Sequence, residues 1–236
     1  MNKIPSVNLA DFLSGDQTKK QKFIDEIGHA YENIGFVALR GHFLDTELVE
    51  SLYSEIKNFF DLPTEIKEKY EIPGIGGLEE TYFDNYIKNG NSILRPIHYP
   101  PIKTEPKGAE RAAAHGDINL ITLLMGAQGK GLQVQNHKGD WIDAVAESDE
   151  LMINVGDMLS RHSNNKLKST IHRVTNPPKE MWGTSRYSIP FFMHPISDMK
   201  LDVLENCIDE NNPKQFDDIT SGEFLDERLR ELGLKK

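Results

Sequence analysis

The sequence has almost no cysteine and no surplus of basic residues, and each absence excludes a class of protein. Cys207 is the only cysteine among the 236 residues, so an internal disulfide is excluded and a thiolate metal cluster is not expected. Lysine and arginine number 27 against 37 acidic residues, which gives a formal net charge of -10. No basic stripe with interleaved aromatics is present, so a nucleic-acid partner is not expected.

Long apolar runs are also missing. No stretch reaches the roughly 18 to 20 apolar residues that a membrane span needs. The amino terminus, MNKIPSVNLADF, lacks the apolar core of a signal peptide. Together with the low cysteine content, these features predict a soluble cytoplasmic protein without a membrane partner.

The length and the apolar content fit one domain over residues 1–236, because 38% hydrophobic residues suffice for one sizeable core. A helical pattern begins after Asp16 and ends at Gly35, between the extended stretches IPSVNL and GFVALRGH. A second amphipathic helix is predicted between Asp45 and Pro63. These signals predict an α/β segment over residues 1–75 that packs on the core.

The pattern changes at Ile93 to short apolar or alternating runs separated by turn residues, which predicts a sandwich or barrel of short strands over residues 93–200. Glycines 126, 129 and 131 are interpreted as hairpin turns, because no lysine followed by serine or threonine opens a helix after them. In the last segment, residues 201–236, Thr220 and Glu223 form a capping box that predicts a terminal helix.

A histidine and an aspartate stand two residues apart in AAAHGDINLITLL. On a strand such positions share a face, so His115 and Asp117 project together, with Asn119, Ile121 and Leu123 continuing the row. His172, in KSTIHRVT, is a candidate third donor. Two histidines and one carboxylate with open positions are the ligand set of non-haem iron(II) oxygenases. The alternative is a chance triplet among 8 histidines, with His172 as a satisfied core residue.

A second pair, Arg186 and Ser188, lies two residues apart in SRYSIPFF, and no acidic residue shares that strand face. If the face is interior, the guanidinium needs an anionic partner, because an unpaired buried charge is strongly unfavourable. A carboxylate ligand would be bound bidentately by the arginine, with the serine hydroxyl adding a hydrogen bond. The alternative is a surface arginine on an edge strand.

The motifs HGD, HRV and RYS followed by IPFF together resemble the iron(II)/2-oxoglutarate-dependent dioxygenases, in particular the subfamily of isopenicillin N synthase and the plant flavonoid oxygenases. RPIHYPP, GLQVQNHKGDWIDA and the opening IPSVNLADF are also similar to that family, so the resemblance covers nearly the whole chain. It implies a mainly β protein with flanking α-helices and a double-stranded β-helix core of the jelly-roll, cupin-like kind.

Carried over to this sequence, the resemblance implies iron(II) ligands at His115, Asp117 and His172. Arg186 and Ser188 would bind the distal carboxylate of the co-substrate 2-oxoglutarate, and Tyr99 would donate a hydrogen bond to it. The implied reaction uses dioxygen to hydroxylate, desaturate or cyclise a small-molecule substrate, with decarboxylation of 2-oxoglutarate to succinate. The stretch RHSNNKLK is interpreted as a solvated turn. The remaining histidines are interpreted as structural or surface residues: His29, His42, His98, His137, His162 and His194.

The chain departs from this family in its middle. PGIGGLEE runs almost directly into TYFDNY, where the family carries several tens of additional residues, so residues 76–92 are interpreted as a shortened helical linker. Two alternatives stay open. One is an isopenicillin N synthase-like oxidase, which has the same iron ligands and an R-x-S pair but does not use 2-oxoglutarate. The other, suggested by the shortening, is a metal-binding barrel without catalytic activity. The sequence does not predict the oligomeric state or the identity of the substrate.

Overall fold

The computed structural model describes residues 3–42, 47, 49–51, 54, 83–125, 131–147 and 150–235. Most of the helix predicted between Asp45 and Pro63, the glycine-rich part of the linker and glycines 126 and 129 lie outside these residues. The boundaries predicted at residues 75, 92 and 200 stay predictions. No helix in the described ranges is both long and apolar enough to cross a membrane.

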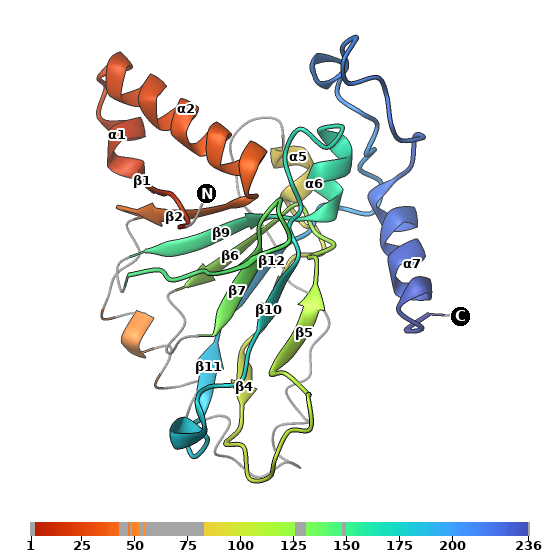
Figure 1. Cartoon of the computed structure of the whole chain (residues 1–236). Coiled ribbons are helices and arrows are strands. Elements are labelled where there is room, and N and C mark those ends of the chain that lie inside the picture. Colours follow the sequence, from red (N-terminus) through yellow and green to blue (C-terminus); the bar gives the residue numbers. More distant parts are fainter. Residues whose placement is uncertain are drawn as a thin grey trace.

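The described chain is mainly β, as predicted, and its twelve strands form three sheets (Figure 1). The largest sheet has the order β1-β2-β9-β6-β12-β3, the second β5-β10-β7-β8, and the third pairs β11 with β4. All pairings except the parallel β1–β2 pair are antiparallel, and most join strands far apart in the sequence. The strands are β1 (Ser6–Asn8), β2 (Phe36–Arg40), β3 (Ile93–Leu94), β4 (Ile97–Tyr99), β5 (Ala112–His115), β6 (Ile121–Met125), β7 (Leu132–Gln135), β8 (Trp141–Asp143), β9 (Leu151–Val155), β10 (His172–Val174), β11 (Arg186–Ser188) and β12 (Pro190–Met193).

Helices flank these sheets. In Figure 1, α1 and α2 lie beside β1 and β2, whereas α7 lies on the opposite side of the sheets, beyond β5. The helices are α1 (Leu9–Leu13), α2 (Gln17–Asn33), α5 (Asp84–Ile87), α6 (Asp157–His162) and α7 (Ser221–Glu231), with short 3₁₀ turns η2 (Lys179–Met181) and η3 (Glu205–Cys207).

Local sequence signals explain where α2 begins and ends. The Asp16 carboxylate accepts hydrogen bonds from the backbone N–H groups of Thr18 and Lys19, at 2.8 and 3.2 Å, which caps the helix. After the helix, Gly35 has a φ of 68°, and a Cβ there would lie 2.0 Å from the Lys168 carbonyl oxygen. The predicted helix boundaries are therefore confirmed.

Strand β2 is buried on both faces and organises two parts of the core. Phe36 and Ala38 face β7 and β9 residues such as Val134, in the space between the two larger sheets. Val37 and Leu39 point the other way, where α2 covers the sheet. Alternate side chains of β2 therefore contribute to two parts of the core, one under α2 and one between the sheets.

The prediction that His115, Asp117, Asn119, Ile121 and Leu123 form a continuous row along one strand is wrong. β5 ends at His115 and β6 begins at Ile121, and the connection between them runs to α6. The Asp117 carbonyl accepts a hydrogen bond from the Asp157 N–H at 2.7 Å, and the Asn119 carbonyl accepts one from the Met158 N–H at 3.2 Å. The first N–H groups of a helix have no partner within it, so carbonyl groups of this connection bond to the start of α6.

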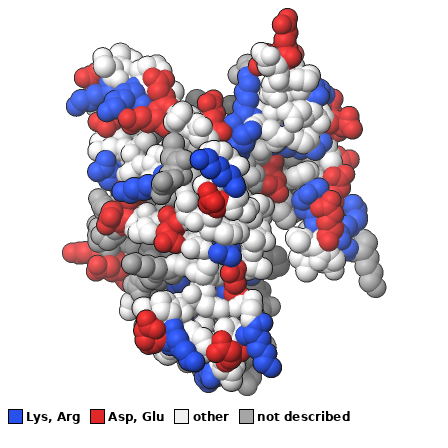
Figure 2. All heavy atoms as spheres, viewed as in Figure 1, with Lys and Arg blue, Asp and Glu red and all other residues white. Residues whose placement is uncertain are grey.

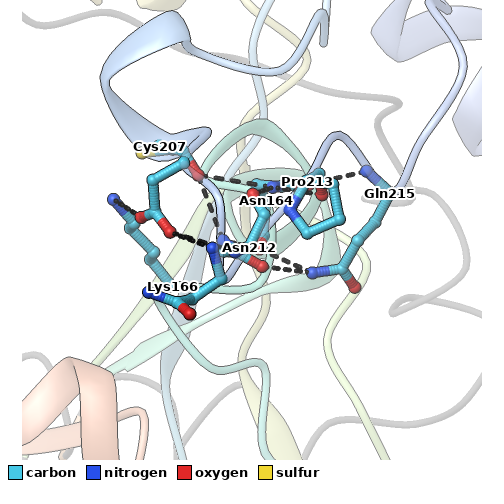
Figure 3. A network of polar contacts seen from close by, with 8 residues as sticks. Asn164, Lys166, Cys207, Asn212, Pro213 and Gln215 are labelled. Atoms are coloured by element: carbon cyan, nitrogen blue, oxygen red, sulfur yellow. Dashed lines mark hydrogen bonds and ion pairs between the residues drawn. The ribbon is translucent and has the colours of Figure 1, made fainter.

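The prediction that RHSNNKLK is a solvated turn is also wrong, because Asn164 in this stretch is fully buried. Its Nδ2 donates to the carbonyl oxygens of Asn212 and Pro213, at 3.1 and 3.0 Å, and its Oδ1 accepts from the Gln215 N–H at 2.9 Å (Figure 3). The φ of Asn164 is 52°, a left-handed conformation that asparagine tolerates better than most residues. The segment that leads to α7 is therefore attached to the turn after α6.

Candidate metal and co-substrate site

Three predicted ligands converge at the ends of two paired strands. His115 is the last residue of β5, His172 is the first residue of β10, and the two residues are directly opposite in the antiparallel register. Asp117 follows β5, and one donor atom from each residue lies within 4.8 Å of the other two. The Asp117 Oδ1 is 3.7 Å from the His172 Nε2. The fold thus brings His172 next to His115, although the two residues are 57 positions apart in the sequence.

Both imidazole rings are oriented by backbone carbonyls. His115 Nδ1 lies 2.7 Å from the Ala113 oxygen, and His172 Nδ1 lies 3.1 Å from the Thr170 oxygen. A carbonyl oxygen only accepts, so each Nδ1 carries a proton and Nε2 is the nitrogen left for a metal. This tautomer is the one a histidine needs in order to bind a metal through Nε2.

The Asp117 carboxylate is held by buried polar neighbours. Its Oδ2 accepts hydrogen bonds from Thr122 Oγ1 at 2.6 Å and from Asn154 Nδ2 at 2.8 Å. Asn119 Nδ2 in turn donates to Thr122 Oγ1 at 2.9 Å. The Oδ2 atom is therefore engaged by protein donors, whereas Oδ1 is directed toward His172.

The sequence analysis missed these supporting residues, although a signal was present. Thr122 and Asn154 stand inside the otherwise apolar strands ITLLM and LMINV, and both are nearly fully buried. Because buried polar side chains are almost always hydrogen-bonded, such positions indicate a polar partner inside the fold. Here that partner is the carboxylate of Asp117.

The donor set fits a divalent transition metal. Burial lowers the pKa of His172, although the nearby Asp117 charge acts in the opposite direction. His172 is therefore neutral at pH 7, as a metal ligand must be. Two imidazole nitrogens and one carboxylate oxygen suit iron(II), and a cation here would also compensate the buried charge of Asp117.

A cavity of about 270 Å³ adjoins these three residues and contains the predicted co-substrate residues. Arg186 and Ser188 on β11 are 3% and 4% exposed, and both line the cavity. Tyr99 on β4 is opposite Arg186 in the strand register, and its ring centre lies 5.1 Å from the guanidinium carbon. The arginine is thus interior, and not a surface residue of an edge strand.

Two further arginines, Arg95 and Arg111, line the same cavity and were missed by the sequence analysis. Arg111 Nη2 donates to the Thr184 carbonyl at 2.9 Å, and burial lowers the pKa of its guanidinium. Its position four residues before His115 is the sequence signal that could have identified it. Three guanidinium groups around one cavity favour an anionic ligand.

The histidines interpreted as structural lie in different surroundings. His98 stacks on Tyr187 with ring centres 4.7 Å apart and hydrogen-bonds Ser185 at 3.0 Å. His162 is buried on α6, whereas His194 follows β12 and lines a second cavity beside the metal site. His194 therefore lies closer to the predicted site than the sequence analysis expected.

Sequence comparisons identify two family profiles along the chain. The profile of the 2OG-Fe(II) oxygenase superfamily matches residues 90–195, and the profile described as non-haem dioxygenase in morphine synthesis N-terminal matches residues 4–104. A 2-oxoglutarate-Fe(II) type oxidoreductase, hxnY of Emericella nidulans, is 35% identical over 146 residues, which are 61% of this chain and 41% of the relative. The chain thus spans less than half the length of that relative in the alignment.

Other relatives align over nearly the whole chain. The 2-oxoglutarate-dependent dioxygenase frbA of a Dothideomycetidae species is 25% identical over 323 aligned positions, which cover 96% of both chains. This alignment is longer than the 236 residues of the present chain, so the relative carries residues that have no counterpart here. The difference agrees with the shortening noted in the sequence.

Solved structures show the same fold. A crystal structure of a protein assigned to the 2OG-Fe(II) oxygenase family, from Caulobacter crescentus, is 32% identical and covers 98% of this chain and 100% of its own, with a TM-score of 0.85. A full-length protein of Neurospora crassa, crystallised in complex with alpha-KG and 5-formyluracil, is 27% identical, with coverages of 97% and 96% and a TM-score of 0.87. The double-stranded β-helix predicted for the core is confirmed by these neighbours.

Proposed function

The chain belongs to the 2OG-Fe(II) oxygenase superfamily, and we propose that it is an iron(II)- and 2-oxoglutarate-dependent oxygenase of a small-molecule substrate. The reaction would hydroxylate, desaturate or cyclise that substrate while 2-oxoglutarate is decarboxylated to succinate. One observation carries the proposal: the His115, Asp117 and His172 donor atoms open into the cavity that contains Arg186 and Ser188.

In this proposal His115 and His172 bind the metal through Nε2, and Asp117 binds it through Oδ1. Thr122 and Asn154 hold the other carboxylate oxygen, which limits Asp117 to one metal-facing atom. When bound at these residues, iron(II) supplies the redox chemistry by which dioxygen is used. The protein contributes a fixed ligand geometry and a buried surrounding.

The co-substrate is oriented by the opposite end of the cavity. Arg186 would bind the distal carboxylate of 2-oxoglutarate through charge-assisted hydrogen bonds, with the Ser188 hydroxyl as a further donor. The Tyr99 phenol would donate to the same carboxylate from the neighbouring strand. Because this end of the cavity is nearly closed to solvent, these interactions are stronger than they would be in water.

A small-molecule substrate is supported by a structural neighbour. The Neurospora crassa protein has been crystallised with alpha-KG and either thymine or 5-formyluracil. These ligands belong to that protein, and only the general class of a small organic substrate is transferred here.

Anaerobic titration of the apoprotein with iron(II) and then with 2-oxoglutarate tests the proposal. We expect a weak visible charge-transfer band of the chelated co-substrate, absent from Arg186→Ala and present in Arg230→Ala, whose arginine is exposed on α7. Iron binding without the band would instead favour the oxidase that does not use 2-oxoglutarate. Release of succinate upon admission of oxygen distinguishes the oxygenase from a metal-binding barrel without activity.

A further inference from the structure

A second, larger cavity of about 620 Å³ adjoins the metal site. It shares four wall residues with the co-substrate cavity: Arg95, His115, Asp117 and Phe192. His172 and Arg186 line only the first cavity. A molecule in the second cavity would therefore contact the metal site beside His115 and Asp117 while 2-oxoglutarate occupies the first.

One wall of this cavity is helix α7, which is held firmly in place. The Thr220–Glu223 capping box starts the helix, and Ser221 Oγ donates to the Ile196 carbonyl at 2.7 Å. Phe224 is buried against Met158 and neighbouring core residues. The helix therefore presents a defined face to the cavity, composed of residues three or four positions apart: Leu225, Arg228, Leu229 and Leu232.

Most of the wall is apolar. The α7 leucines are joined by Ile118 and Phe192, and by Ile93 at the edge of the sheet, which is 43% exposed. An exposed apolar wall beside a reactive centre is typical of a site for an organic ligand. The wall thus favours a substrate with an apolar ring or chain.

The charged residues of the wall are unequally compensated. Arg228 Nη2 is bound to Glu231 at 2.9 Å, and its guanidinium lies 5.2 Å from the Phe224 ring centre. The Asp157 carboxylate is hydrogen-bonded to the Ser169 side chain. Arg95, in contrast, has no ion pair or side-chain hydrogen bond to any residue that the structure describes. Arg95 is exposed, so its guanidinium is open to a ligand at the boundary between the two cavities.

From this arrangement we propose that the second cavity binds the primary substrate, an inference that rests on the proposed function. The substrate is an apolar molecule with one carboxylate, and Arg95 binds that carboxylate. A guanidinium group is suited to a carboxylate because its donors match the two oxygens. The apolar part would lie along α7, so that the carbon to be oxidised is adjacent to the metal.

The test uses the full chain loaded with nickel(II), which replaces iron without oxygen chemistry, and with saturating 2-oxoglutarate. The probes are 4-phenylbutyrate and its neutral counterpart 4-phenylbutyramide, and their binding is measured by ligand-observed NMR. We expect the acid to bind about ten- to a hundredfold more tightly, as a charge-assisted hydrogen bond implies. The preference for the acid should disappear in Arg95→Gln and persist in Arg230→Gln, which removes the same charge from an exposed position on α7.

Arg230 is one of many surface charges. Figure 2, in the same view as Figure 1, shows Lys and Arg side chains interspersed with Asp and Glu side chains over the surface.

The outcomes separate the two proposals. Equal binding of acid and amide, binding of neither, or an unchanged preference in Arg95→Gln would overturn the substrate assignment while leaving the oxygenase assignment intact. A loss of 2-oxoglutarate affinity in Arg95→Gln without any change in probe preference would overturn it too, because Arg95 would then belong to the co-substrate. Failure of the wild-type protein to bind 2-oxoglutarate would refute the proposed function, and this inference with it.

Discussion

The two cavities beside the metal site differ in how they are built. The co-substrate cavity is formed by paired strands, and its polar side chains, such as Asp117 and Asn154, are buried and hydrogen-bonded to one another. The second cavity is partly walled by α7, which reaches the site through the segment attached to Asn164. The first cavity is therefore determined by strand register, whereas the second depends on how a terminal helix is attached.

Removal of a metal ligand should have the most complete effect on the first cavity, because it abolishes metal binding there. We expect His172→Ala to abolish metal-dependent stabilisation, since two donors remain where three are needed. In the wild type, metal at 100 times its dissociation constant adds about 2.7 kcal/mol of stability. Thermal unfolding with and without manganese(II) measures the effect. His98→Ala, which alters a histidine outside the site, should keep the full metal-induced shift, and an equal shift in His172→Ala would refute the ligand assignment.

Loosening of α7 should affect the second cavity alone. Phe224→Ala removes a buried ring beneath the helix and should cost about 3 to 5 kcal/mol in the free energy of unfolding, measured by urea denaturation. Metal affinity of the folded variant should stay within about twofold of the wild type, because the two regions share few partners. The matched control is Leu234→Ala, whose side chain is 74% exposed and should change stability by less than about 0.5 kcal/mol. A parallel loss of metal affinity would show that the regions are not independent.

A change in the support of Asp117 should have a smaller effect, confined to the first cavity. Asn154→Ala removes a donor to Oδ2 and should weaken manganese(II) binding about ten- to a hundredfold, as measured by calorimetry. The exposed Asn33→Ala on α2 serves as the control. Wild-type affinity in folded Asn154→Ala would mean that Thr122 alone orients the carboxylate.

The smallest expected effect is the pH dependence of the apoprotein. Burial lowers the pKa of His162, His172 and His194, so the unfolded state binds more protons than the folded state as the pH falls. The contribution to stability is complete above the unfolded pKa of about 6.5 and is lost as the pH decreases below it. Urea denaturation between pH 7 and pH 5 should show this decline. His162 lines neither cavity, so His162→Gln should reduce the decline without changing either of them. An unchanged pH profile in that variant would contradict this interpretation.

Short-range signals were enough to predict several elements correctly. Asp16 and Gly35 mark the ends of α2, and the Thr220–Glu223 pair marks the start of α7. These predictions succeeded because a cap or a left-handed glycine depends on backbone groups only a few residues away. The residues of the site were also recognisable, because two histidines, a carboxylate and an arginine in strand-like segments are costly to bury without partners.

The predictions that failed concern segments whose hydrogen bonds are made far away in the sequence. The connection after His115 bonds to the start of α6, and Asn164 is buried by carbonyls from residues 207–213. The position of Arg111 four residues before His115 was a weak signal by itself, because only the fold places this arginine in the cavity with Arg186. Such partners are not visible in a local pattern.

The sequence by itself determined the candidate metal ligands and the candidate anion-binding pair, because their residue types and spacings in strand-like segments are costly to bury without partners. Its resemblance to a known family added the class of the fold and the candidate co-substrate role of Arg186, Ser188 and Tyr99. Only the tertiary structure decided which carboxylate oxygen faces the histidines, which arginines share a cavity, and that α7 closes one side of a second one. The physical reason is that these features arise from contacts between strands and helices that are distant in the sequence. The role of a carboxylate, a guanidinium group or a helix face depends on which groups the fold places beside it.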